Sequence, residues 1–447
     1  MYDPSLHRHC VVARKGRYFA VDFVDEYGDP LALNVIESRL QECVRLADDE
    51  ESAGQTPELG WLTSSDRDSW ADANKEMLRV GGSAMSSALE KLESGALMLC
   101  LDDEEPVSKK QCADEFWTGG MTSGHNRWFD KSIQIMCSNN GKAGLVGEHS
   151  MMDGMPMIAF SDHVTKFTYA DAKKKSGVVT ATSTGGVEDI FEGCLDCLTV
   201  HDSQIPTMVE KAKSDFATLV ADHDLHVQDF QGYGSSYIKK VGYSPDAYIQ
   251  MAIQLAMYRL HGKQTGTYEA TQMRPYLHGR TETTRSVSME GCAFVKCMGL
   301  QATFDGDESS LEEKRSLLQK AVRSHVKYIG MAASGKGVDR HLFGMSMLVR
   351  DEDEMPKLYS DPLFVRSKTW RVSTSHLSHP KFENWGFGEV VPDGVGIGYG
   401  VKVDSCVFNV TARREHGWTE RVSHLLEEVM LEMRSLHDTV PSMKSKL

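Results

Sequence analysis

The sequence contains the run Glu148-His149-Ser150-Met151-Met152-Asp153-Gly154, which places a histidine and a carboxylate four residues apart beside a glycine. The apolar residues 143–147 precede this run, so the sequence predicts a loop that leaves a buried strand. An imidazole is suited to remove a proton from a hydroxyl or a thiol because its pKa lies near working pH. Asp153 is close enough along the chain to orient the His149 ring. The motif alone is weak, and a surface turn with a solvated histidine is the alternative interpretation.

Composition limits the classes of function. The chain has 447 residues, of which 40% are hydrophobic and 25% charged, as in a soluble globular protein of two or three domains. A net charge of −15 argues against a nucleic-acid partner, so an anionic substrate would need a local basic pocket. The sequence shows no apolar stretch of transmembrane length, so no transmembrane segment is expected. The cysteines lack a regular spacing, which indicates reduced thiols. They form no cluster with histidines in the sequence, so no bound metal is expected.

The last three residues carry a targeting signal. Ser445, Lys446 and Leu447 form the tripeptide Ser-Lys-Leu, which the peroxisomal import receptor reads at a free C-terminus. We therefore expect a protein of the peroxisomal matrix. A mitochondrial form made from an upstream start is an open alternative.

The pattern of apolar residues indicates two lobes, residues 1–198 and 199–447. A segment rich in Lys, Ser, Thr and Gly, from 173 to 186, is expected to be an exposed linker or insertion. The expected elements are a hairpin around Lys15-Gly16, a helix from Ala32 to Leu46, a Gly/Ser-rich patch near Gly81, a strand at 133–136, a helix that Ser244 caps and that stops at Gly262, helices from Ser310 to Ala333 and from Trp418 to Leu436, and two strands around a turn within 390–397.

Several further segments, in a fixed order, are too specific to be filler. They are Asn126-Arg127-Trp128-Phe129-Asp130, Ser244-Pro245-Asp246-Ala247-Tyr248, Thr267-Tyr268-Glu269-Ala270, Gly279-Arg280-Thr281-Glu282-Thr283, Asp339-Arg340-His341-Leu342, Ser373-Thr374-Ser375 and Val391-Pro392-Asp393-Gly394. Together with the His149 loop they resemble the carnitine/choline acyltransferase family, from about residue 10 to about residue 436.

This resemblance implies an α/β fold of two lobes similar to chloramphenicol acetyltransferase, with mixed sheets flanked by helices and an active-site tunnel between the lobes. It implies a monomer that transfers an acyl group between CoA and the hydroxyl of carnitine, with CoA as a co-substrate and no permanently bound cofactor. His149 matches the family's catalytic base and Asp153 its acidic partner. Ser375 matches the donor that stabilises the tetrahedral oxyanion.

Carnitine carries a carboxylate and a quaternary ammonium group. The resemblance implies that Tyr268, Thr281 and Arg340 hold the carboxylate, which a guanidinium can grip with two hydrogen bonds. Choline lacks that carboxylate, so Arg340 favours carnitine, while a structural ion pair of Arg340 with Asp339 or another acid is the alternative. Ser373 matches a carnitine contact, and an aromatic ring at Phe387 can face the quaternary nitrogen.

The CoA contacts implied by the resemblance lie at two lysines and two acids. Lys239 matches a lysine of the family's CoA loop, and Lys240 could compensate for Ser235, which replaces a second lysine. Asp246 and Glu269 match polar contacts to CoA. His376 also departs from the family, which usually has glutamine after Ser-Thr-Ser.

The resemblance implies that one position limits the length of the acyl chain. This position is expected on a strand before Val390. Counting without a gap from Ser375 places Trp385 there. A bulky indole closes the space that longer chains need, so acetyl and propionyl groups are expected. Residues 384–386 also resemble fungal members.

Family members carry a helical segment ahead of the hairpin that opens this chain, so the first lobe is expected to be incomplete. Two alternatives to a short-chain carnitine acyltransferase therefore stay open. One is a truncated, non-catalytic remnant that binds CoA or carnitine. The other is a medium-chain carnitine or a choline acyltransferase.

Overall fold

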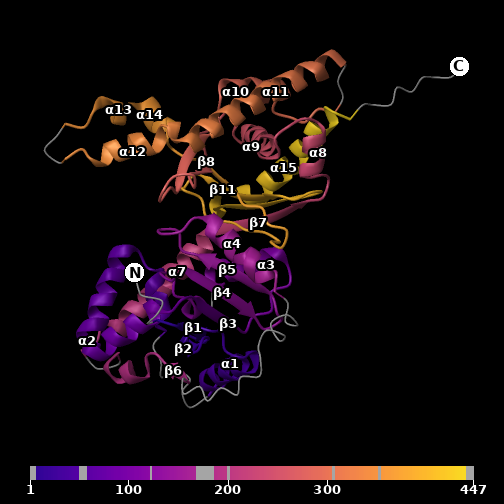
Figure 1. Ribbon diagram of the computed structural model, residues 1–447. Coiled ribbons are helices and arrows are strands. Elements are labelled where there is room, and N and C mark those ends of the chain that lie inside the picture. Colours follow the sequence, from indigo (N-terminus) through magenta and orange to yellow (C-terminus); the bar gives the residue numbers. More distant parts are fainter. Residues whose placement is uncertain are drawn as a thin grey trace. The chain divides into compact units, whose positions relative to one another are not determined.

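The computed structural model describes residues 7–49, 58–120, 123–167, 186–198, 202–304, 308–350 and 354–438. Contacts divide the chain into two compact units, Met1–Ala221 and Asp222–Leu447 (Figure 1). The boundary expected after residue 198 is too early, because helix α7 (Ile205–Asp222) buries its apolar face in the core of the first unit. Both the segment expected as a linker and the C-terminal tripeptide lie outside the described residues.

The first unit is built on a six-stranded mixed sheet with the strand order β5-β4-β3-β1-β2-β6. Its strands are β1 (His9–Arg14), β2 (Arg17–Asp22), β3 (Met98–Asp102), β4 (Ile133–Ser138), β5 (Ala143–Gly147) and β6 (Val187–Asp189). The expected hairpin joins β1 to β2. Lys15 and Gly16 both have positive φ, 50° and 76°, as a two-residue turn between twisted antiparallel strands requires.

Helices flank this sheet. They are α1 (Leu33–Ala47), α2 (Arg67–Ser94), α3 (Lys109–Thr118), α4 (Gly154–Thr165), α6 (Leu195–Leu198) and α7. The region near Gly81 lies inside α2, so the Gly/Ser-rich composition produces a kink at Gly82 (φ 52°) within one long helix. Strand β5 is an edge strand and is only half buried, so the buried strand expected before His149 is wrong.

The second unit is also built on a six-stranded mixed sheet, ordered β7-β12-β11-β10-β8-β9. Its strands are β7 (His223–Phe230), β8 (Thr267–Gln272), β9 (Thr281–Arg285), β10 (Val372–His376), β11 (Val395–Val401) and β12 (Cys406–Arg413). Its helices are α8 (Ser235–Lys240), α9 (Pro245–His261), α10 (Met289–Met298), α11 (Glu308–Met331), α12 (Asp339–Met347), α13 (Lys357–Ser360), α14 (Pro362–Ser367) and α15 (Trp418–Ser435).

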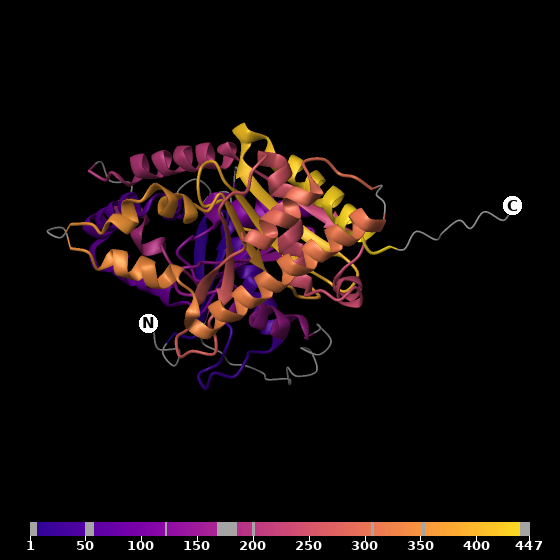
Figure 2. The ribbon, with the colours of Figure 1, turned by 90° about the horizontal axis from the view of Figure 1, so that it is seen from above.

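Helix α9 is the centre of the second unit. It packs with α11 and α15 on one face of the sheet (Figure 2), and every residue from Ala247 to Met257 is buried. Gly262 ends the helix in the left-handed conformation, as expected. Ser244 occupies the N-cap position, but its side chain makes no capping hydrogen bond, so that part of the expectation is wrong.

Some of the other expected elements form and others do not. The helices expected from Ala32, Ser310 and Trp418 form within two residues of their expected starts. Within 390–397 only β11 forms a strand, since the segment before it makes a turn in which Gly394 N–H donates to the Val391 carbonyl. All cysteines lie in the described ranges and are free thiols. No helix in those ranges combines the length and the apolar character that a membrane span needs.

Candidate active site

In the first unit, His149 lies in the loop between β5 and α4. The side chain is 77% exposed, whereas the Asp153 side chain at the start of α4 is only 20% exposed. Glu148 shapes the loop, because its carboxylate accepts hydrogen bonds from Ser150 N–H and Ser150 Oγ. The loop therefore presents the imidazole to the surface on a short, hydrogen-bonded turn.

The hydrogen bond of the His149 ring decides its tautomer. Nδ1 lies 2.9 Å from the Met152 carbonyl oxygen, which can only accept, so Nδ1 carries the hydrogen. The basic lone pair is then on Nε2. Asp153 Oδ1 is 3.6 Å from Nδ1, which is too long for a hydrogen bond. The Met152 backbone carbonyl, and not the Asp153 carboxylate, therefore accepts the hydrogen of Nδ1 and orients the ring.

In the second unit, strand register sorts the expected residues onto two faces of the sheet. Ser373 pairs with Tyr268 of β8, and side chains alternate along each strand, so Tyr268, Ser373 and Ser375 share one face. Thr281 pairs with Gln272 and lies on that same face. We call it the front face. The opposite, back face carries Thr374, to which Gln250 of α9 donates a hydrogen bond of 2.9 Å.

Arg340 lies at the first turn of α12 beside the front face. Its guanidinium donates to Tyr268 Oη at 3.0 Å and to the Thr281 carbonyl at 3.4 Å, and it lies over the Tyr268 ring. Asp339 instead pairs with Arg285 through two hydrogen bonds of 2.8 and 2.7 Å. In the described parts of the chain, no carboxylate forms an ion pair with Arg340. The alternative of a structural ion pair with Asp339 is therefore wrong.

The Ser375 hydroxyl is half-buried near the C-terminal end of β10. No hydrogen bond joins Ser375 Oγ to any other residue that the structure describes. Ser373 is buried one step earlier on the same face. A hydroxyl held on a central strand, with its donor uncommitted, can serve a developing negative charge without reorganising.

Trp385 lies in an irregular segment between β10 and β11, so the strand expected at this position is wrong. Its indole N–H donates to the Tyr399 carbonyl at 3.0 Å, and its ring stacks on Phe387 with the centroids 5.7 Å apart. The segment lies on the front face. A Cβ at Gly398, which pairs with Ser375, would come within 2.8 Å of the Trp385 carbonyl oxygen. Glycine at 398 therefore lets this segment approach the strand beside Ser375.

The back face holds a buried network of titratable groups. His325 Nε2 lies 2.6 Å from Glu269 Oε2, and Tyr399 Oη donates to Asp246 Oδ1 at 2.7 Å. Burial, followed by the charge of Asp246, raises the pKa of Glu269 to about 7. Burial opposes the charge of Asp246, but hydrogen bonds from His376 and Tyr399 outweigh it and lower that pKa.

This network changes the expected picture of the CoA contacts. Glu269 is buried under Asp246, so it supports the Asp246 carboxylate from behind, whereas Asp246 itself is partly exposed. Ligating atoms of Asp246, Glu269 and His325 lie within 4.8 Å of one another, but they bond to each other. The sequence did not reveal His325 or Tyr399 as members, because no local spacing connects them to the acids.

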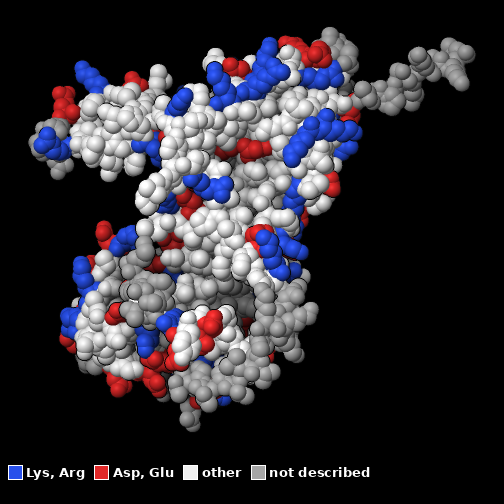
Figure 3. All heavy atoms as spheres, in the orientation of Figure 1, with Lys and Arg blue, Asp and Glu red and all other residues white. Residues whose placement is uncertain are grey.

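Lys239 and Lys240 close helix α8 and are exposed. Figure 3 shows lysine and arginine side chains gathered over this part of the second unit. Ser235 begins the helix, and its N–H donates to the Lys402 carbonyl. The local basic surface that an anionic substrate needs is therefore present despite the negative net charge of the chain.

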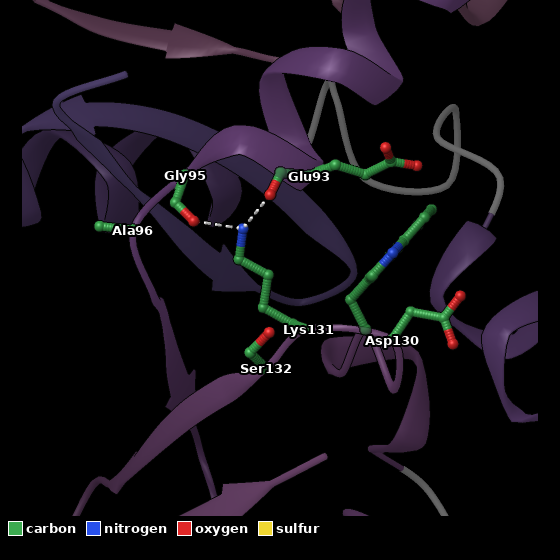
Figure 4. Close-up of a pocket in the computed structure, with 7 residues that line it drawn as sticks. Glu93, Gly95, Ala96, Asp130, Lys131 and Ser132 are labelled. Atoms are coloured by element: carbon green, nitrogen blue, oxygen red, sulfur yellow. Dashed lines mark hydrogen bonds between the residues drawn. The ribbon is translucent and has the colours of Figure 1, made fainter. Parts of the chain in front are cut away.

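A cavity of about 280 Å³ lies in the first unit, away from these groups. Lys131 reaches into it and donates to backbone carbonyls at the end of α2, including those of Glu93 and Gly95 (Figure 4). Burial lowers the pKa of this amine to about 8. The neighbouring Arg127 is buried against Asp102 with two hydrogen bonds of 2.8 Å. This part of the Asn126–Asp130 motif is thus structural.

Comparison with known proteins gives the same family. The family model described as "Choline/Carnitine o-acyltransferase" matches residues 2–428. A mitochondrial carnitine O-acetyltransferase of Saccharomyces cerevisiae is 34% identical over 89% of this chain and 57% of its own length. A carnitine O-acetyltransferase of Columba livia is 31% identical over 98% of this chain and 68% of its own length. This chain thus spans little more than half of the yeast relative.

Among solved structures, a trichothecene 15-O-acetyltransferase of Fusarium sporotrichioides has a TM-score of 0.40 and 11% identity, over 74% of this chain and 76% of that one. The α/β fold class expected from the sequence, with mixed sheets and flanking helices in two units, is confirmed. Because the family model spans nearly all of the chain and the ordered motifs agree with it, the chain belongs to the choline/carnitine O-acyltransferase family.

Proposed function

We propose that this chain provides a carnitine O-acetyltransferase activity, the reversible transfer of a short acyl group between CoA and the hydroxyl of carnitine. The observation that carries the proposal is the Arg340 guanidinium, which lies beside Tyr268 and Thr281 without a carboxylate partner in the described structure. A substrate carboxylate would supply the missing charge. Choline has none, so the same cation would give it no benefit.

The proposed chemistry needs two groups of this chain. His149 Nε2 removes the proton from the carnitine hydroxyl, or from the CoA thiol in the reverse direction. The oxygen or sulfur then attacks the acyl carbonyl, and Ser375 Oγ donates a hydrogen bond to the oxyanion. Both substrates react at one histidine, so no covalent acyl-enzyme is required. CoA is a co-substrate whose phosphates meet Lys239 and Lys240, and the protein acts as a monomer.

The direct test is a turnover assay on the purified chain with acetyl-CoA and either carnitine or choline. We expect thiol release that depends on carnitine, with choline a poor acceptor. Binding of CoA in calorimetry without any turnover would identify a non-catalytic remnant. A preference for choline would exclude the proposed role of Arg340.

Acyl-chain selection is expected to depend on Trp385, because its segment lies beside Ser375. The parent should use acetyl-CoA and propionyl-CoA well and octanoyl-CoA poorly. Trp385→Gly should gain octanoyl activity, since each methylene that enters the opened space contributes about 0.8 kcal/mol when buried. Rates with acyl-CoAs of increasing length measure the change.

Phe382→Ala, in the same irregular segment, is the matched control for loosening of that segment. A thermal melt shows whether either variant destabilises the fold. A parent that prefers octanoyl-CoA would show that another residue limits the chain.

Peroxisomal localisation is proposed from Ser445-Lys446-Leu447 alone. A fluorescent protein fused ahead of the native C-terminus should appear in puncta with a peroxisomal marker, and deletion of Leu447 should disperse it. Puncta that persist after the deletion would point to a different signal. A mitochondrial pool of the undeleted fusion would indicate a second address.

A further inference from the structure

His376 follows Ser375 on β10, but its side chain lies on the opposite, back face of the sheet. Its ring stacks on Tyr399 of β11 with the centroids 4.9 Å apart and the planes 4° apart. Both ring nitrogens are engaged. Nδ1 is 3.1 Å from Asp246 Oδ1, and Nε2 is 2.7 Å from Ser378 Oγ. The ring is therefore held in one orientation by an aromatic face and two polar partners.

The hydrogen bond between His376 Nδ1 and Asp246 can have only one direction. An ionised carboxylate can only accept, and the low pKa of Asp246 means that it is ionised, so Nδ1–H donates to it. Asp246 sits in the first turn of α9. The hydrogen bond thus ties the end of β10, next to Ser375, to the start of α9.

Asp246 depends on this donor because of what lies behind it. The buried Glu269 carboxylate is its neighbour on one side, and that pair repels when both are ionised. His325 from α11 and Ser286 contact Glu269, whereas Asp246 receives hydrogen bonds from His376 and Tyr399 and shares a further one with Glu269 itself. Loss of the imidazole would leave Asp246 with the Tyr399 hydroxyl and with the hydrogen bond that it shares with a second acid.

We propose that His376 is a positioning residue for CoA, acting through Asp246. It keeps the Asp246 carboxylate ionised and fixed at the partly exposed edge of the back-face network. The inference rests on the proposed function, in which Asp246 contacts CoA.

Two substitutions distinguish the effect of the hydrogen bond to Asp246 from the effect of the aromatic ring of His376. His376→Phe keeps an aromatic ring for the stack on Tyr399 and removes both nitrogens. His376→Asn places an amide N–H near the position of Nδ1 and so keeps the donor to Asp246. Michaelis constants for acetyl-CoA and carnitine, kcat, and the dissociation constant of CoA by calorimetry are measured for the parent and both variants, with a thermal melt for each.

His376→Phe should raise the KM for acetyl-CoA and the Kd for CoA by roughly 10- to 150-fold, the range for a hydrogen bond to a charged group. The carnitine KM should stay within about threefold, since no carnitine contact is touched, and kcat should change little. His376→Asn should recover most of the lost CoA affinity. A merely structural role would instead lower the melting temperature and affect both substrates alike.

Unchanged CoA affinity in His376→Phe would overturn the inference, as would an equal rise of both Michaelis constants or a failure of His376→Asn to recover binding. The proposed function fails differently. A parent that binds CoA but does not turn over contradicts the activity, and the calorimetric comparison still decides the role of His376. A parent that does not bind CoA contradicts both.

Discussion

Replacing His149 by alanine is expected to lower kcat for acetyl transfer by roughly 10²- to 10⁴-fold, to the edge of detection, as for loss of a general base. The Met152 carbonyl fixes the Nδ1–H tautomer and leaves Nε2 as the base, and alanine offers no group to replace it. The melting temperature should change little, because the imidazole is 77% exposed. Initial rates of thiol release with saturating carnitine measure the effect.

The control for this variant is His163→Ala. His163 lies on α4, close in sequence and also exposed, and its ring contacts Phe167. It should keep parental activity. CoA binding by calorimetry should be the same in both variants and in the parent. Activity of His149→Ala within a few-fold of the parent would exclude the proposed base.

Arg340→Asn is expected to raise the carnitine KM by roughly 30- to 5,000-fold. This rise corresponds to a loss of binding free energy on the order of 2–5 kcal/mol, as when one end of a hydrogen-bonded charge pair is removed. Asparagine can donate one hydrogen bond but carries no charge. The preference for carnitine over choline should narrow, because choline never used the cation. Arg340→Lys should lie in between, since an ammonium keeps the charge and loses the planar fork.

Arg366→Asn is the matched control. Arg366 is an exposed arginine of α14 in the same unit, and its loss tests whether net charge alone changes carnitine binding. It should leave the carnitine KM unchanged. Unchanged carnitine kinetics in Arg340→Asn would mean that the carboxylate is held elsewhere, and an equal effect in both variants would mean that the charge acts at long range.

Much of the local structure could be predicted, because it depends on neighbours in the chain. Lys15-Gly16 supplies the two positive φ angles of a hairpin, and Gly262 supplies the left-handed end of α9. The apolar stripe from Trp418 predicted α15 almost to the residue. Local composition was less informative at the Gly/Ser-rich patch near Gly81, because that patch lies inside the long helix α2, with a kink at Gly82.

Residue types and their order were sufficient to name the candidate residues and the family, since a base, an oxyanion donor and a cation are chemical properties of single side chains. The arrangement of those residues was decided by the tertiary structure. Strand register puts Tyr268 and Ser375 on one face of the second sheet. Their neighbours in the sequence, Glu269 and His376, lie on the opposite face. Similarly, only packing brings His325 of α11 to Glu269 of β8, because the two residues lie on separate elements that are far apart in the sequence. Contacts of this kind depend on how distant segments pair, and a local pattern of residues contains no information on that pairing.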